Sequence, residues 1–275
     1  MNLNEQYQLA AEALISADAL LIGAGAGIGV DSGLPDFRGP EGFWKAYPPF
    51  HGRRFREIST PHWFQTDPQL AWGFFGHRLN LYRDAIPHEG FQILQRWSKR
   101  FSRGSFVFTS NVDGQFQKAG FSSDLIVECH GSIHHLQCSR PCQNDIWPVG
   151  ELRLEIDLQT IKTTSPLPSC PQCGGVARPN ILMFGDSYWV EDRTARQWKK
   201  WQTWLRVANA GRLVTIELGA GLAVPTVRIE CELQPGTLIR VNPSEAEVEP
   251  GGISVPAGAL TALREIDDRI NKLVF

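Results

Sequence analysis

Residues 19–38 read ALLIGAGAGIGVDSGLPDFR, and this stretch decides the fold class. It opens with the apolar run Ala19 to Ile22, which is typical of a short buried strand. Glycines then occupy every second position from Gly23 to Gly29, a spacing that differs from the G-x-G-x-x-G fingerprint. Glycines directly after a strand let backbone N–H groups approach a phosphate closely. The stretch therefore predicts a nucleotide-binding turn, although a tight strand-to-helix turn packed with small residues explains it equally well.

Further apolar runs follow at residues 106–108, 125–127, 213–216 and 238–241. Helical patterns lie between or around them, including an amphipathic helix near Tyr7 to Ile15 and a closing helix from Ala259 to Leu273. Short buried strands that alternate with helices are typical of a parallel sheet covered on both faces. We therefore expect an α/β fold with a Rossmann-like parallel sheet and helices on both faces.

Two regions break this alternation. Residues 41–86 are rich in aromatic side chains and indicate irregular helices, and residues 133–175 hold four of the six cysteines. Within the second region, Leu152 to Gln159 alternates strictly, which predicts a half-exposed strand. We expect a Rossmann-like, dinucleotide-binding domain from residues 1–40, 87–132 and 176–275. The two insertions, 41–86 and 133–175, should form a smaller domain with a helical part and a zinc module.

The four clustered cysteines form two close pairs, Cys138 with Cys142 and Cys170 with Cys173. Each tight turn aims two sulfurs at one point, and two such turns complete a tetrahedral thiolate site for zinc. Four protein ligands leave no open position, so the predicted metal is structural. A pair of redox dithiols is the alternative. Zinc is favoured because Gly-Gly follows the second pair, as in a metal knuckle, and because close pairs in a reducing compartment suggest a metal.

Polar residues follow two of the predicted strands. Ser110, Asn111 and Asp113 come after 106–108, and His130 comes after 125–127. Ligands of open parallel sheets bind beyond the carboxyl ends of the strands. Asn and Asp there can hold a carboxamide or ribose hydroxyls, and a histidine can act as general base. Helix capping and simple packing are the alternative roles.

In sequence order, these motifs resemble those of the sirtuins. Residues 25–38 are similar to the family's NAD-binding signature, with Gly29 where Ser is usual. Residues 109–113 are similar to its nicotinamide-pocket motif, and residues 130–132 to its catalytic His-Gly-Ser. The resemblance implies NAD contacts at Gly25, Ala26, Gly27, Asp36, Phe37, Arg38, Ser110, Asn111, Asp113, Gly219, Ala220, Gly221 and Asn242.

The resemblance extends to the segment after the second cysteine pair. Residues 178–186, RPNILMFGD, resemble the family segment that pairs with an extended substrate peptide and lines the acyl-lysine tunnel. It implies substrate contacts at Ile181, Leu182, Phe184 and Gly185. The family also carries a structural zinc held by four cysteines at this place in the chain. Ala220 and Gly221 depart from the Thr-Ser that is usual there.

By resemblance, the chain is expected to be an NAD-dependent protein lysine deacylase. In the family's mechanism, Asn111 and Asp113 hold the nicotinamide ribose while the acyl oxygen attacks its anomeric carbon. Nicotinamide leaves, and His130 deprotonates a ribose hydroxyl as the acyl group moves to ADP-ribose. The alternatives on the same site are a protein mono-ADP-ribosyltransferase or NAD glycohydrolase, and an NAD-sensing module. ADP-ribosyl transfer stays an open alternative because residues 111–121, 138–142 and 217–221 resemble a macrodomain-associated microbial branch of the family that transfers ADP-ribose to protein.

The composition limits the classes of partner that the chain is expected to bind. The net charge of −2 gives no electrostatic reason to expect nucleic acid or an anionic membrane. No apolar run is long enough to span a bilayer, and the opening residues lack a signal-peptide pattern. We expect a cytoplasmic enzyme whose partner is an acyl-lysine protein or peptide, and the sequence does not indicate its oligomeric state.

Overall fold

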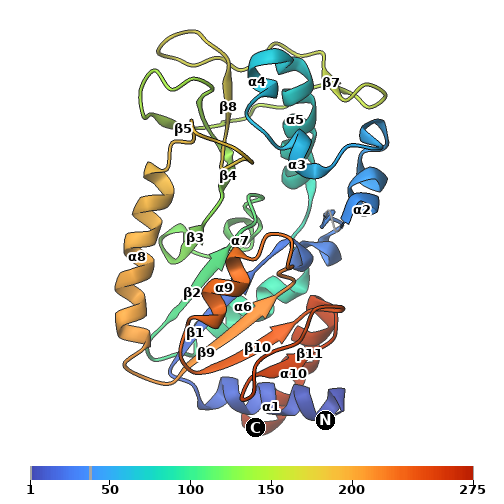
Figure 1. Cartoon of the computed structure of the whole chain (residues 1–275). Helices are drawn as coiled ribbons and strands as arrows, with labels where there is room; N and C mark the ends of the chain where they lie inside the picture. Colours follow the sequence, from blue (N-terminus) through green and yellow to red (C-terminus); the bar gives the residue numbers. More distant parts are fainter. Residues whose placement is uncertain (1, 37–38, 275) are drawn as a thin grey trace.

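The computed structural model describes residues 2–36 and 39–274 (Figure 1). Its main sheet has six strands in the order β11-β10-β9-β1-β2-β3, and every neighbouring pair is parallel. The strands are β1 (Ala19–Ala24), β2 (Ser105–Thr109), β3 (Ile126–Glu128), β9 (Leu213–Leu218), β10 (Thr237–Val241) and β11 (Ile253–Val255). The predicted fold class and the five strands predicted for the parallel sheet are confirmed, whereas β11 was not predicted.

Helices cover both faces of this sheet. On one face lie α1 (Leu3–Ser16), α6 (Glu89–Ser98) and α10 (Ala259–Val274), which pack against Leu20 and Ile22 of β1. On the other lie α8 (Asp192–Ala208) and α9 (Thr226–Glu232), which share a core with Ala19 and Leu21. Successive strand residues point to opposite faces, so a strand buried on both faces reads as a continuous apolar run.

A second, smaller group of elements lies at the other end of the molecule (Figure 1). It holds an antiparallel sheet in the order β5-β4-β8, and its core is rich in aromatic side chains. The strands here are β4 (Gly131–Cys138), β5 (Ile146–Pro148), β8 (Ala177–Ile181) and the separate pair β6 (Ile156–Asp157) and β7 (Lys162–Thr163). The helices are α2 (Gly39–Ala46), α3 (Phe55–Ile58), α4 (Trp63–Thr66) and α5 (Pro68–Asp84).

The remaining helical pieces are short. They are the 3-10 segments η1 (Ala26–Ser32), η2 (Pro48–Phe50) and η3 (Ser123–Leu125), and the helix α7 (Gln115–Lys118). The predicted domain boundary at residue 176 falls just before β8, which pairs with β4 and not with the main sheet. The division into two domains remains a prediction. Across the described ranges, no helix combines the length and apolar character needed to cross a membrane.

The half-exposed strand predicted from Leu152 to Gln159 is largely wrong. Only β6 within it is extended and paired, with β7 as its partner. The preceding carbonyls are bound by side chains of α5: Arg83 donates to Leu152, and Asn80 donates to Leu154 at 2.8 Å. Because these carbonyls bond to a helix, the segment follows α5 and does not form a ladder with a neighbouring strand.

Candidate active site

The glycine turn after β1 packs backbone to backbone against a second turn after β9. The amide of Gly25 donates to Leu218 and that of Gly27 to Gly219, both at 3.0 Å. A Cβ at Gly25 would lie 2.6 Å from the Cα of Ala220, and one at Gly219 would lie 2.5 Å from Gly27. Packing therefore explains these glycines at least in part, as the structural alternative predicted. Within the turn Ala26 is exposed and Gly27 is half-buried, so a ligand can approach the backbone at these two residues.

The end of this stretch is described only in part. Phe37 and Arg38, two of the predicted NAD contacts, lie outside the described residues. Asp36 is half-buried directly after Pro35. Ala26 opens η1, whose left-handed cap at Gly33 (φ 78°) turns the chain toward Pro35.

The strand-end residues 110–113 contact the glycine turn directly. Ser110 donates its amide to Ala24 at 3.2 Å, and the Asn111 side chain donates to the Gly25 carbonyl at 3.0 Å. The Asn111 amide in turn binds the Thr109 hydroxyl at 3.0 Å. These bonds place the predicted amide group against the predicted phosphate-binding backbone, so two motifs 86 positions apart meet.

Asp113 is a buried carboxylate at the start of α7. Its Oδ1 accepts the amide of Gln115, the first residue of α7, at 2.9 Å, although the N-cap position itself is occupied by Gly114. Burial raises the pKa of Asp113 to about 6, the nearby Glu128 charge adds to this, and the bond from Gln115 opposes it. At neutral pH the group is an anion in a dry environment, which suits it to face a cationic ring or sugar.

His130 lies between the sheet and α9. Its Nε2 lies 3.3 Å from the hydroxyl of Thr226. Burial lowers the pKa of His130, and the backbone of Ser110 opposes that shift. The imidazole is therefore neutral at pH 7, and a neutral imidazole offers a nitrogen lone pair, as a general base requires.

His134, to which sequence assigned no role, also supports the site. Strand β4 loses register with β8 between Ser132 and Leu136, which leaves residues 133–135 as a bulge. From this bulge Ile133 donates to the Val112 carbonyl at 3.0 Å, and His134 Nε2 donates to the Asp113 carbonyl at 2.8 Å. No sequence signal marks this contact, because it depends on a local irregularity of the ladder.

The predicted substrate segment begins at the end of β8. Leu182 donates its amide to the His130 carbonyl at 3.0 Å, so this segment joins the candidate base directly. Ile181 is buried, whereas Leu182 and Phe184 are more than a third exposed and offer apolar surface. Gly185 has φ 67°, a conformation that favours glycine, and it reverses the chain.

A buried ion pair shapes this turn. Arg178 donates to both oxygens of Asp186 at 2.6 and 3.0 Å, and neither side chain has any exposed surface. Asp186 also accepts the amides of Met183 and Tyr188 at 3.4 and 3.0 Å. Asp186 is thus the polar centre of the turn that carries Leu182 and Phe184.

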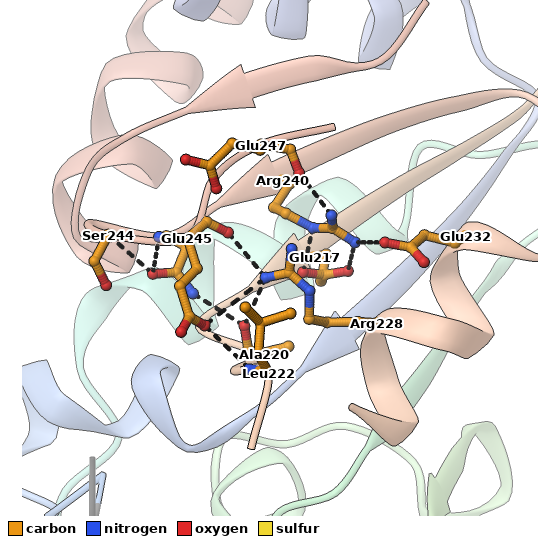
Figure 2. Close-up of polar contacts among 10 residues, drawn as sticks. Glu217, Ala220, Leu222, Arg228, Glu232, Arg240, Ser244, Glu245 and Glu247 are labelled. Atoms are coloured by element: carbon orange, nitrogen blue, oxygen red, sulfur yellow. Dashed lines mark hydrogen bonds and ion pairs between the residues drawn. The ribbon is translucent and has the colours of Figure 1, made fainter. Parts of the chain in front are cut away.

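The turn after β9 is bonded to the loop after β10, as Figure 2 shows. Asn242 donates to the Ala220 carbonyl at 2.9 Å and accepts the amides of Ser244 and Glu245. Arg228 donates to the Glu245 carbonyl at 2.9 Å, and the Glu245 carboxylate accepts the amide of Leu222 at 3.1 Å. Asn242, predicted to approach NAD, thus supports the turn formed by Gly219, Ala220 and Gly221.

The four predicted metal ligands converge. The sulfurs of Cys138, Cys142, Cys170 and Cys173 all lie within 4.8 Å of one another. The Cys138 and Cys173 sulfurs are 3.7 Å apart, as are those of Cys142 and Cys170. A tetrahedron of thiolates about 2.3 Å from zinc has sulfur–sulfur edges of about 3.8 Å. The cluster therefore fits a structural zinc with no open ligand position.

Comparison with known proteins agrees with this geometry. The sequence profile described as Sir2 family matches residues 25–210. An NAD-dependent protein deacylase of Aquifex aeolicus (strain VF5) is 28% identical, covering 90% of this chain and 93% of its own. NAD-dependent protein deacylase 2 of Pyrobaculum aerophilum is 31% identical, covering 80% of this chain and 76% of its own. A solved Sir2 homolog–NAD complex superposes with a TM-score of 0.71 at 22% identity, over 97% of this chain and 94% of that one. The chain belongs to the Sir2 family.

Proposed function

We propose that the chain is an NAD-dependent protein lysine deacylase that transfers the acyl group to ADP-ribose and releases nicotinamide. One observation carries the proposal: His130 lies between two parts of the site, because the amide of its neighbour Cys129 binds Thr109 at the end of β2 and the His130 carbonyl accepts the amide of Leu182. A neutral base thus stands between the nucleotide turn and an apolar peptide-facing segment. The curated relatives reported above carry the names NAD-dependent protein deacylase, which supports the same reading.

In this proposal each side of the site has a separate task. The backbone of Gly25, Ala26 and Gly27, with the turn Gly219 to Gly221, receives the dinucleotide. Asn111 and the Asp113 anion hold the nicotinamide ribose and stabilise positive charge as the bond to nicotinamide breaks. The acyl oxygen bonds to the anomeric carbon as nicotinamide leaves, and His130 takes a proton from a ribose hydroxyl whose oxygen attacks the acyl carbon. The lysine amine then leaves, and water completes the acyl ester of ADP-ribose.

The substrate segment completes the arrangement. Extended backbone at Ile181 and Leu182 can add a peptide strand through main-chain hydrogen bonds, which tolerate many sequences. Leu182 and Phe184 supply apolar contacts for the acyl-lysine. We propose that zinc at the four cysteines stabilises the smaller group of elements around the β5-β4-β8 sheet, called the small unit below, and takes no part in the chemistry. A cytoplasmic location remains a prediction from the sequence.

The substitution His130→Ala tests the assignment. We expect deacylation of an acetyl-lysine peptide to fall at least about 100-fold, because a positioned general base contributes that much or more. Calorimetry should give an NAD dissociation constant within about twofold of wild type, since the predicted nucleotide contacts lie elsewhere. His62→Ala, an exposed histidine of the small unit, is the matched control and should behave as wild type.

Two outcomes would contradict the proposal. Robust deacylation by the His130→Ala protein would remove its assigned base. Nicotinamide release that does not depend on acyl peptide, or a gain of one ADP-ribose in protein mass, would favour ADP-ribosyl transfer or NAD hydrolysis on the same site. Mass spectrometry with and without acetyl, longer acyl and acidic acyl peptides distinguishes these results.

A further inference from the structure

The amide and the ring of His88 make three hydrogen bonds at the N-terminus of α6, and two of them hold η1. Its amide donates to the Ser32 hydroxyl at 3.0 Å, and its Nε2 donates to the Ile28 carbonyl at 2.8 Å. Its Nδ1 accepts the amide of Gly90 at 3.0 Å and so caps α6. Because Nδ1 accepts and Nε2 donates, the ring is fixed as the neutral Nε2–H tautomer.

The ring has little freedom to move. It lies against Phe91 with ring centroids 4.9 Å apart, and burial lowers the pKa of His88 while the bond to Ile28 opposes that shift. A Cβ at Gly90 would lie 2.6 Å from the ring, so glycine is needed for this close fit. The imidazole is therefore a rigid link between α6 and the glycine-rich turn.

The turn needs such links because its own residues cannot fix its shape. Glycine has wide backbone freedom, and ordering it costs more conformational entropy than ordering other residues. Its first half is held by Leu218, Gly219 and Asn111, as described above. Among the described residues, the hydrogen bonds that other elements make to Ile28–Ser32 come from His88 and from Leu260 of α10, which donates to Asp31 at 3.1 Å.

We propose that His88 is a positioning residue that keeps the glycine turn in its nucleotide-receiving shape. This inference rests on the proposed function, in which that turn receives the dinucleotide. If the turn spends less time in the competent shape, the apparent affinity for NAD falls in proportion to the competent fraction. The loss should appear in binding of NAD and in its KM, whereas kcat at saturating NAD should change little.

His88→Asn separates the link from the cap. Asparagine is among the best N-cap residues, so it can still accept the Gly90 amide, but it is too short to reach Ile28. We expect the dissociation constant for NAD to rise about fivefold, which is the effect of one lost hydrogen bond. The melting temperature should stay close to that of wild type. His88→Ala, which loses both bonds, should show the same rise in the dissociation constant together with a lower melting temperature.

Asn2→Ala is the matched stability control. Asn2 caps α1 through the amide of Glu5 at 3.0 Å and does not touch the turn. Its loss should lower the melting temperature and leave NAD binding unchanged. Calorimetry with NAD alone, at a temperature below all the melting temperatures, measures the dissociation constant for NAD and so tests the role of His88 without any deacylation assay. Wild-type affinity in His88→Asn, or an equal loss of affinity in Asn2→Ala, would overturn the inference. If wild type binds NAD but does not deacylate, the proposed reaction fails and the link can still be measured.

Discussion

Asp113 and His130 carry pKa values that burial has shifted in opposite directions. Burial raises the pKa of Asp113 to about 6, so the group is an anion above that pH and neutral below it. Burial lowers the pKa of His130 below its ordinary value of 6.5, so the imidazole is neutral at pH 7. Both groups therefore have the charge that the proposed chemistry needs at neutral and alkaline pH, and acidification through about pH 6 removes the Asp113 anion.

Asp113→Asn should weaken catalysis and stabilise the fold. The folded-state pKa lies above the unfolded value, so the anion destabilises the native state above pH 6, and this cost fades as pH falls toward 4. The neutral amide keeps an acceptor for Gln115 without that cost. We expect a gain on the order of 2 kcal/mol in unfolding free energy at pH 7.5, which disappears near pH 4.

The same variant should lose at least about tenfold in kcat/KM for NAD at pH 7.5, because a buried anion near developing positive charge is removed. Its activity should also depend less on pH between 5.5 and 7 than that of wild type. Urea unfolding and initial rates at several pH values measure both effects. If the Asp113→Asn protein is less stable than wild type at pH 7.5, the buried Asp113 anion does not destabilise the native state as assigned here.

Sequence reasoning found the residues at strand ends but missed their supports. Asn111 and His130 were predictable because ligands bind beyond the carboxyl ends of parallel strands, and each follows such a strand directly. His88, His134 and Thr226 were missed because their partners lie 60, 21 and 96 positions away. Such contacts depend on tertiary packing, which leaves no local pattern in the chain.

At the scale of elements, buried apolar character decided which strands could be predicted. The residues of β1 and β9 are all buried; β1 reads as an unbroken apolar run, and β9 begins with Leu213 and Val214 and is interrupted only by Thr215 and Glu217. In β11 only Val255 is buried, so its three residues gave too weak a signal. The alternating pattern from Leu152 to Gln159 gave a wrong strand prediction because side chains of α5 bind the carbonyls that a neighbouring strand would otherwise bind. An alternating pattern gives no sign of such side-chain bonds.

Among the turns, the one after β8 depends most clearly on charge. Asp186→Asn would leave the Arg178 guanidinium buried without its counter-charge, so we expect unfolding free energy to fall by about 3 kcal/mol. The KM for acyl peptide should rise more than the dissociation constant for NAD, because Leu182 and Phe184 belong to this turn. Chemical denaturation and steady-state kinetics give the two quantities.

An exposed ion pair of the small unit provides the control. Arg153 and Asp84 lie 2.6 Å apart with both side chains more than half exposed. Asp84→Asn should therefore cost less than about 1 kcal/mol and leave both KM values unchanged. Equal losses in the Asp84 and Asp186 variants would show that burial does not govern the second pair.

At the scale of the whole molecule, β4 connects the two functional centres. It begins at the residue after His130 and ends at Cys138, the first of the four clustered cysteines. Its partner β8 likewise runs from the cysteine-bearing end to Ile181 and the substrate segment. The proposed metal site and the catalytic site therefore lie at opposite ends of the same strand pair.

Removing the metal should for this reason impair catalysis from a distance. Cys170→Ser is expected to lose bound zinc, lower the melting temperature and reduce deacylation by at least about tenfold, because metal binding at such sites contributes directly to folding. Cys231→Ala, a buried cysteine of α9, is the control and should keep its zinc. Elemental analysis, thermal unfolding and activity report the three effects. A Cys170→Ser protein with wild-type zinc content would exclude the assigned ligand set.

The bulge at residues 133–135 sets a limit on how this chain can vary in length. Its three residues let one strand leave β8, reach the carbonyls of Val112 and Asp113, and return to β8 before Cys138. A deletion there would straighten the strand and draw it away from the loop that carries Asn111. An insertion of one residue would exchange the two faces of everything downstream, including the first metal ligand. Length changes should be far better tolerated at residues 158–160, the exposed turn between β6 and β7, which lies outside this ladder.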